Sequence, residues 1–107
     1  MWRRRHRPVP YTSVKLVETQ SEAVKHAVEG GIGLVMAGRR PKTAVFRCPS
    51  GCGEVLRINL MPQMGRAWRA RIDKDGRLTL TPSVDLASGC RAHFILAANT
   101  AQVILDA

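Results

Sequence analysis

The chain has 107 residues and carries 17 lysines and arginines against 8 acidic residues, which gives a formal net charge of +9. This length fits one domain and excludes a cofactor-binding domain beside a separate substrate domain. Hydrophobic residues make up 45% of the sequence, which argues against wholesale disorder. No apolar run approaches the ~18–20 residues that a membrane span needs. We therefore expect a basic globular domain.

The first thirteen residues are predicted to form a basic, flexible arm. Arginines and two prolines leave this stretch little apolar material to pack, and it lacks the apolar region of a secretory signal. Residues 14–107 are expected to form the single folded domain.

A short helix is predicted directly after this start. Thr19-Gln20-Ser21-Glu22 has the spacing of a capping box, in which the threonine hydroxyl accepts a hydrogen bond from the glutamate N–H. Apolar residues then recur on one helical face, and Gly30-Gly31 supplies a left-handed end. The spacing predicts a helix over residues 19–29.

The rest of the chain has the pattern of short strands. Segments rich in valine, isoleucine, leucine and threonine alternate with turns, and Asp73-Lys74-Asp75-Gly76 is typical of a hairpin turn. The expected strands are residues 32–36, 43–47, 54–60, 67–72, 78–81, 93–96 and 102–105. The predicted fold is therefore mostly β (α+β), a small antiparallel sheet or partial barrel with one N-terminal helix.

Two pairs of metal-binding residue types lie on predicted turns. Cys48 and Cys52 flank a glycine-rich turn, and Cys90 and His93 precede a predicted strand. Three thiolates and one imidazole are a set that Zn²⁺ binds in tetrahedral geometry. We predict one Zn²⁺ per chain, bound by these four residues and clamping the two turns together. A shell closed by four protein ligands is structural, because catalysis needs an open position.

Other interpretations of the cysteines remain open. The thiols could be buried without a metal, or Cys48 and Cys52 could form a disulfide with Cys90 left over. Spacing does not separate zinc from iron, although a Rieske-type cluster needs two histidines. An odd number of cysteines favours a reducing compartment, so we expect a cytoplasmic protein.

No catalytic residue is assigned, and three weak candidates each have a simpler interpretation. Glu54 could be a general base next to Cys52, but a carboxylate at the start of a strand is commonly a solvated charge. Ser83 and Asp85 could form a turn, hold a zinc ligand in place, or act as nucleophile or base. Because His93 is assigned to the metal, we do not expect a Ser–His–Asp triad.

Basic residues outside the arm gather in two places. Arg39, Arg40 and Lys42 surround a predicted turn, and Arg69 and Arg71 alternate along one strand. A solvated charged face is the simplest interpretation. A net charge of +9 could also attract an acidic protein or nucleic acid, although an aromatic content of 5% offers few platforms for base stacking.

The order of these motifs resembles a family of small bacterial zinc-domain proteins. The resemblance spans about residues 30–105 and is carried by Phe46-x-Cys48-Pro49-x-Gly51-Cys52-Gly53, Trp68, Leu78-Thr79-Leu80-Thr81-Pro82-Ser83-Val84 and Gly89-Cys90-x-x-His93-Phe94. In that family the genes often neighbour those for ubiquitin-like proteins and for homologues of ubiquitin-activating and ubiquitin-conjugating enzymes. Ser50 stands where the family pattern has a cysteine, which leaves three cysteines and His93 as the zinc set.

The resemblance implies an accessory role in bacterial ubiquitin-like conjugation, adaptor-like or ligase-like. The partner would be a ubiquitin-like protein or an activating or conjugating enzyme homologue. We therefore expect a zinc-stabilised interaction module rather than an enzyme. Two alternatives stay open. One is a zinc-dependent hydrolase, such as a deconjugating peptidase with Glu54 or Asp85 as base, and the other is a basic zinc domain that binds nucleic acid.

Overall fold

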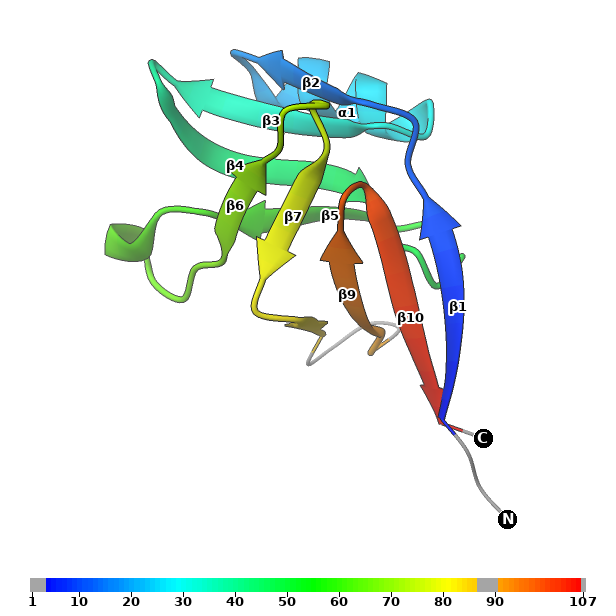
Figure 1. The fold of residues 1–107 in the computed structure, drawn as a ribbon. Helices are drawn as coiled ribbons and strands as arrows, with labels where there is room; N and C mark the ends of the chain where they lie inside the picture. Colours follow the sequence, from blue (N-terminus) through cyan, green and yellow to red (C-terminus); the bar gives the residue numbers. More distant parts are fainter. Residues whose placement is uncertain (1–3, 87–90, 107) are drawn as a thin grey trace.

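A computed structural model describes residues 4–86 and 91–106 of the chain (Figure 1). Short strands dominate these residues, together with one α-helix and one 3-10 turn. In chain order the elements are β1 (Arg4–Pro10), β2 (Val14–Val17), α1 (Gln20–Val28), β3 (Ile32–Ala37), β4 (Arg40–Arg47), β5 (Val55–Asn59), η1 (Pro62–Met64), β6 (Arg69–Ile72), β7 (Leu78–Thr81), β8 (Val84–Asp85), β9 (His93–Ala97) and β10 (Thr100–Asp106). The predicted mostly β class with one helix is confirmed, and the described strands form open sheets.

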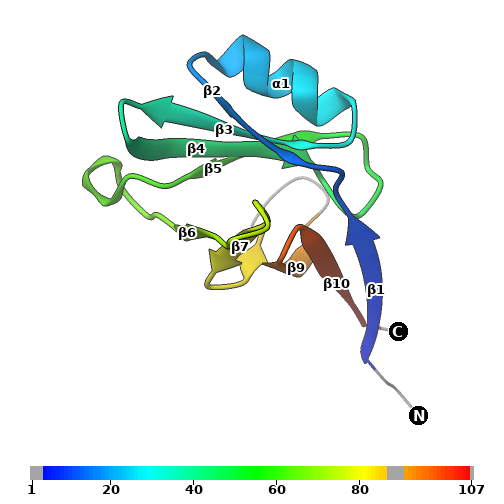
Figure 2. The ribbon, with the colours of Figure 1, turned by 45° about the horizontal axis from the view of Figure 1, so that its top comes forward.

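The first sheet has the strand order β2-β3-β4-β5, and α1 covers one of its faces (Figure 2). Strands β2 and β3 run parallel, while the other neighbours run antiparallel. A parallel pair needs a crossover between its strands, and α1 provides it. The predicted sheet was antiparallel, and this parallel pair at the edge departs from that prediction.

The second sheet has the order β1-β10-β9-β8, and the hairpin β6-β7 lies beside it. Strand β7, yellow in Figure 1, packs next to β9, which is brown. Both the second sheet and the hairpin lie on the side of the first sheet that α1 leaves open (Figure 2). The helix, the first sheet, and this second layer are thus stacked in that order.

Residues 4–10 belong to the sheet, although the sequence suggested an arm there. Strand β1 pairs with β10 in an antiparallel ladder from Arg4 opposite Asp106 to Pro10 opposite Thr100. Main-chain hydrogen bonds make this ladder, so it does not depend on a run of apolar side chains. Val9 adds an apolar contact with the core.

The helix confirms the predicted signals at both ends. Thr19 is the N-cap, and its hydroxyl oxygen accepts a hydrogen bond from the Glu22 N–H at 3.2 Å. The Glu22 carboxylate accepts from the same hydroxyl at 2.9 Å. Gly30 follows the helix in the left-handed region with φ of 97°. No helix in residues 4–86 and 91–106 is long and apolar enough to cross a membrane.

Two apolar clusters hold the layers together. The larger lies between the sheets, where the rings of Phe46 and Phe94 meet edge to face with centroids 6.0 Å apart. The smaller lies under the helix and contains Ala23. A Cβ at Gly33 of β3 would stand 2.5 Å from the Ala23 Cα, so only glycine allows this close approach of helix and strand.

Candidate functional site

A serine and a histidine meet where β7 passes into β8. Ser83 lies in the connection between these strands, and His93 is the first residue of β9. The Ser83 Oγ is 3.3 Å from the His93 Nε2, and both side chains are partly buried. This distance is at the long end of the hydrogen-bonding range, as is common in catalytic pairs before a substrate binds.

Neighbouring residues fix the backbone of Ser83. The Trp68 indole N–H donates to the Ser83 carbonyl oxygen at 3.2 Å. The next residue, Val84, is fully buried and pairs with Phe94 in the β8-β9 ladder. Ser83 is therefore anchored on both sides, by an indole and by a buried strand residue.

Asn99, a buried residue in the β9-β10 turn, joins the hairpin that carries His93 to β7. Its side-chain oxygen accepts from the Leu78 N–H at 2.7 Å, and its backbone N–H donates to the Leu78 carbonyl at 2.9 Å. The neighbouring Ala98 N–H donates to the Thr79 hydroxyl at 3.0 Å. These bonds join β7, which leads to Ser83, to the hairpin that carries His93.

Asp85 lies directly opposite His93 in the β8-β9 ladder. Residues that face each other across an antiparallel pair share one face of the sheet, with Cβ atoms about 4.5–5.5 Å apart. The exposed Asp85 side chain can therefore place negative charge beside the imidazole. Ser83, Asp85 and His93, which the sequence did not combine into a triad, stand within one local structure.

A second serine–histidine pair shows why distance alone does not define a base. The His26 Nε2 is 3.2 Å from the Ser13 Oγ and 3.1 Å from the Ser13 carbonyl oxygen. A carbonyl only accepts hydrogen bonds, so this nitrogen must carry a proton and cannot take one from Ser13. The imidazole also fills the space where a Cβ at Gly31 would stand. His26 therefore ties α1 to the start of β2.

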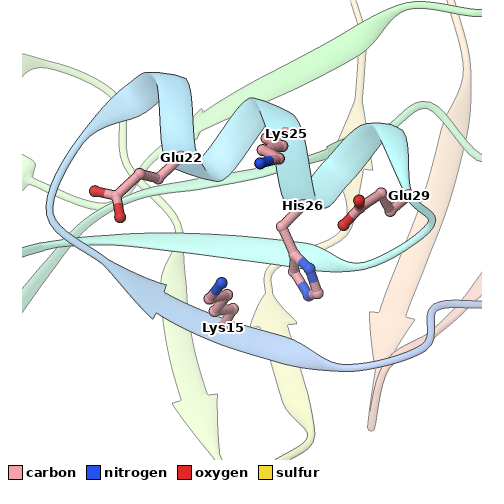
Figure 3. A pocket seen from close by; sticks show the side chains of 5 residues that line it. All are labelled: Lys15, Glu22, Lys25, His26 and Glu29. Carbon is pink, nitrogen blue, oxygen red and sulfur yellow. The ribbon is translucent and has the colours of Figure 1, made fainter.

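This histidine also lines the small cavity shown in Figure 3, together with Lys15, Glu22, Lys25 and Glu29. The cavity has a volume of about 160 Å³, and the His26 imidazole points from α1 toward β2. Because the ring nitrogen is already engaged by Ser13, we assign this pocket a structural role.

The predicted zinc ligands divide between described and undescribed residues. Cys48 is buried directly after β4, whereas Cys52 is exposed in the turn before β5. Ser50 lies between them, with its Oγ 3.1 Å from the Cys48 Sγ and accepting from the Cys52 N–H at 3.3 Å. Cys90 lies outside the described residues. Within residues 4–86 and 91–106, no group of three or more metal-ligating side chains gathers, so the zinc site stays a prediction.

Glu54 and the basic residues of the β3-β4 turn lie on other elements than Ser83. Glu54 closes the cysteine turn, where its carbonyl accepts from the Cys48 N–H at 2.8 Å, and its side chain is exposed. Three basic side chains, those of Arg39, Arg40 and Lys42, are exposed around the β3-β4 turn.

Arg69 and Arg71, in contrast, lie on the strand pair that leads to Ser83. Together with Ala70, Thr79 and Thr81 they line a groove of about 410 Å³ on the β6-β7 hairpin. We call this hollow the hairpin groove.

Comparison with known proteins identifies one family. The sequence model described as "Bacterial ubiquitination-like system serine protease (BubE)" matches residues 17–104, which include Ser83, Asp85 and His93. Comparisons with curated proteins and with solved structures gave no match. Because the match covers most of the 107-residue chain, this protein belongs to the BubE family of a bacterial ubiquitination-like system.

Proposed function

We propose that this protein is a serine protease that acts within a bacterial ubiquitination-like system, with Ser83 as nucleophile and His93 as general base. The contact between Ser83 Oγ and His93 Nε2 at 3.3 Å carries the proposal. The family description, which names a serine protease, supports it. We propose as substrate the bond that joins a ubiquitin-like protein to another group through its carboxyl end.

Each half of the reaction requires two proton transfers through one ring nitrogen. Ser83 Oγ attacks the substrate carbonyl carbon while its proton moves to His93 Nε2. The tetrahedral intermediate then collapses, the bond to the leaving group breaks, and the imidazolium gives its proton to that group. Water releases the acyl group from Ser83 by the same steps, with His93 again as base. Asp85, opposite His93 in the β8-β9 ladder, is the acidic member of the proposed triad.

The Ser13–His26 pair gives the test an internal control. Purified protein is treated with a fluorophosphonate probe, which forms a covalent bond with activated serines, and the labelled residue is found by mass spectrometry. We expect label on Ser83 and none on Ser13. Ser83→Ala and His93→Ala should abolish labelling, whereas Ser13→Ala and His26→Ala should leave it intact. Label that survives Ser83→Ala would disprove the assignment.

A structural zinc ion stays a separate proposal that competes for His93. The predicted ligand set is Cys48, Cys52, Cys90 and His93. Zinc bound through Nδ1 would leave the Nε2 protonated and donating to Ser83, so the same ring could not act as base. We propose that the three cysteines would hold the metal, with its fourth position left to a ligand other than His93, and that His93 remains available to Ser83.

Zinc content measured per chain separates the two roles of His93. If His93 is the base, His93→Ala keeps the wild-type zinc content and loses labelling, while Cys52→Ser loses zinc. If His93→Ala loses zinc and the wild type takes no label, the protease proposal fails. The observations would then favour a zinc-stabilised adaptor, which a pull-down with the ubiquitin-like protein and its conjugating enzyme would test.

A further inference from the structure

The hairpin groove presents two arginines on one outward face. Strand β6 pairs with β7 so that Arg69 stands opposite Thr81 and Arg71 opposite Thr79. The intervening Leu78 and Leu80 are buried and face the core. Alternation along a strand therefore places both arginines and both threonines on the other face, where Arg69, Arg71 and Thr81 are exposed and Thr79 is partly buried.

These two arginines have no ion-pair partner in residues 4–86 and 91–106. Arg77 differs, because it pairs with Asp75 at 2.8 Å and approaches Asp73 at 3.9 Å in the adjoining turn. Both carboxylates of this turn are thus engaged by Arg77, although Arg71 adds a weaker attraction to Asp73. The positive charge of the groove is available to a ligand.

The groove ends near the candidate nucleophile along the chain. Thr81, at one end of it, is two residues before Ser83, and two residues span at most about 7 Å. Arg69 and Arg71 are themselves two residues apart on one strand face, or about 6.5–7 Å. That spacing matches the distance between alternate side chains of an extended peptide.

We infer that the hairpin groove binds an extended acidic segment of the substrate, with Asp or Glu at alternate positions facing Arg69 and Arg71. Charge complementarity selects the segment, and the exposed Thr81 hydroxyl offers it a hydrogen bond. This inference rests on the proposed protease function, because it assigns the groove to the substrate whose scissile bond reaches Ser83.

Fluorescein-labelled peptides test the groove by binding, without requiring turnover. The acidic probe is Gly-Glu-Gly-Glu-Gly, and the uncharged comparison is Gly-Gln-Gly-Gln-Gly. The groove variant combines Arg69→Glu with Arg71→Glu. The control variant combines Arg39→Glu with Arg40→Glu, which changes the net charge equally at the β3-β4 turn. Circular dichroism confirms that each variant is folded.

We expect fluorescence anisotropy to show that the wild type prefers the acidic peptide. Exposed ion pairs are individually weak, so the groove variant should lose about tenfold in affinity and the control variant less than about twofold. Excess acidic peptide should also slow fluorophosphonate labelling of Ser83 in the wild type. An equal loss in both variants would attribute binding to diffuse charge and overturn the inference, as would equal binding of the two peptides.

The two proposals fail in distinguishable ways. Labelling of Ser83 with no acidic preference overturns the groove and leaves the protease intact. Acidic binding that depends on Arg69 and Arg71, with no labelling of Ser83, overturns the protease and therefore the assignment of the groove to a protease substrate.

Discussion

Replacing Asn99 with alanine should destabilise the protein in two ways, through a lost hydrogen bond and through an unfavourable backbone conformation. The variant removes the acceptor that holds the Leu78 N–H at 2.7 Å. It also places alanine at φ of 65°, a left-handed conformation that asparagine tolerates better than alanine does. Leu78 is fully buried, so water cannot replace the lost acceptor freely.

The expected loss follows from these two costs. An unsatisfied buried donor costs about 1–3 kcal/mol. Left-handed alanine adds about 1 kcal/mol. The free energy of unfolding should therefore fall by about 2–4 kcal/mol, and Tm by at least about 8 °C for a domain of this size.

Urea unfolding followed by circular dichroism measures this loss, and Ala98→Gly is its matched control. Ala98 occupies the same turn with φ of 47°, but no side-chain hydrogen bond depends on it. We expect that control to change stability by less than about 1 kcal/mol. Hydrogen exchange should show selective loss of protection at the Leu78 amide in Asn99→Ala. A loss below 1 kcal/mol, or normal Leu78 protection, would refute the reasoning.

Three further variants test other parts of the structure. In urea unfolding, Gly33→Ala should lower the free energy of unfolding by about 1–3 kcal/mol, because the added Cβ would overlap Ala23. A variant as stable as the wild type would show that α1 and β3 approach each other less closely than described. Hydrogen bonds from the Arg77 and Asp75 N–H groups lower the pKa of Asp73, with a smaller contribution from the Arg77 charge. A carboxyl group whose pKa is lowered in the folded state stabilises the fold above its unfolded-state pKa, and this stabilisation is lost as pH falls through the folded-state pKa. In acid titrations, Asp73→Asn should therefore lose less stability below about pH 4 than the wild type does. An unchanged profile would contradict this. Trp68→Phe removes the donor to the Ser83 carbonyl, and we expect slower fluorophosphonate labelling with a stability loss of about 1 kcal/mol; an unchanged labelling rate would exclude a positioning role for Trp68.

Local signals predicted local structure in this chain. The helix cap at Thr19, the left-handed Gly30 and the Asp73 turn are confirmed because each depends on residues within a few positions. Strand β1 could not be recognised in the same way, because its partner β10 lies at the other end of the described chain. The parallel β2-β3 pair likewise depends on where α1 packs.

The candidate site shows the same division. Ser83, Asp85 and His93 were all recognised as chemically capable residues, but their combination depends on the β8-β9 ladder. The expectation that Ser83 could hold a zinc ligand in place already linked it to the predicted ligand set, but only the folded chain shows that its neighbour is His93. Asn99 carried no sequence signal for its link to Leu78, which joins two strands distant in the chain.

The β6-β7 hairpin places the residues that pack in the core and the residues that line the groove on different faces. Leu78 and Leu80 are buried in the core, whereas Arg69 and Arg71 line the groove on the opposite face and would contact its ligand. Substitutions at the outward positions leave the buried residues of the hairpin unchanged. In the groove proposal, partner preference and packing are therefore carried by different residues of one hairpin.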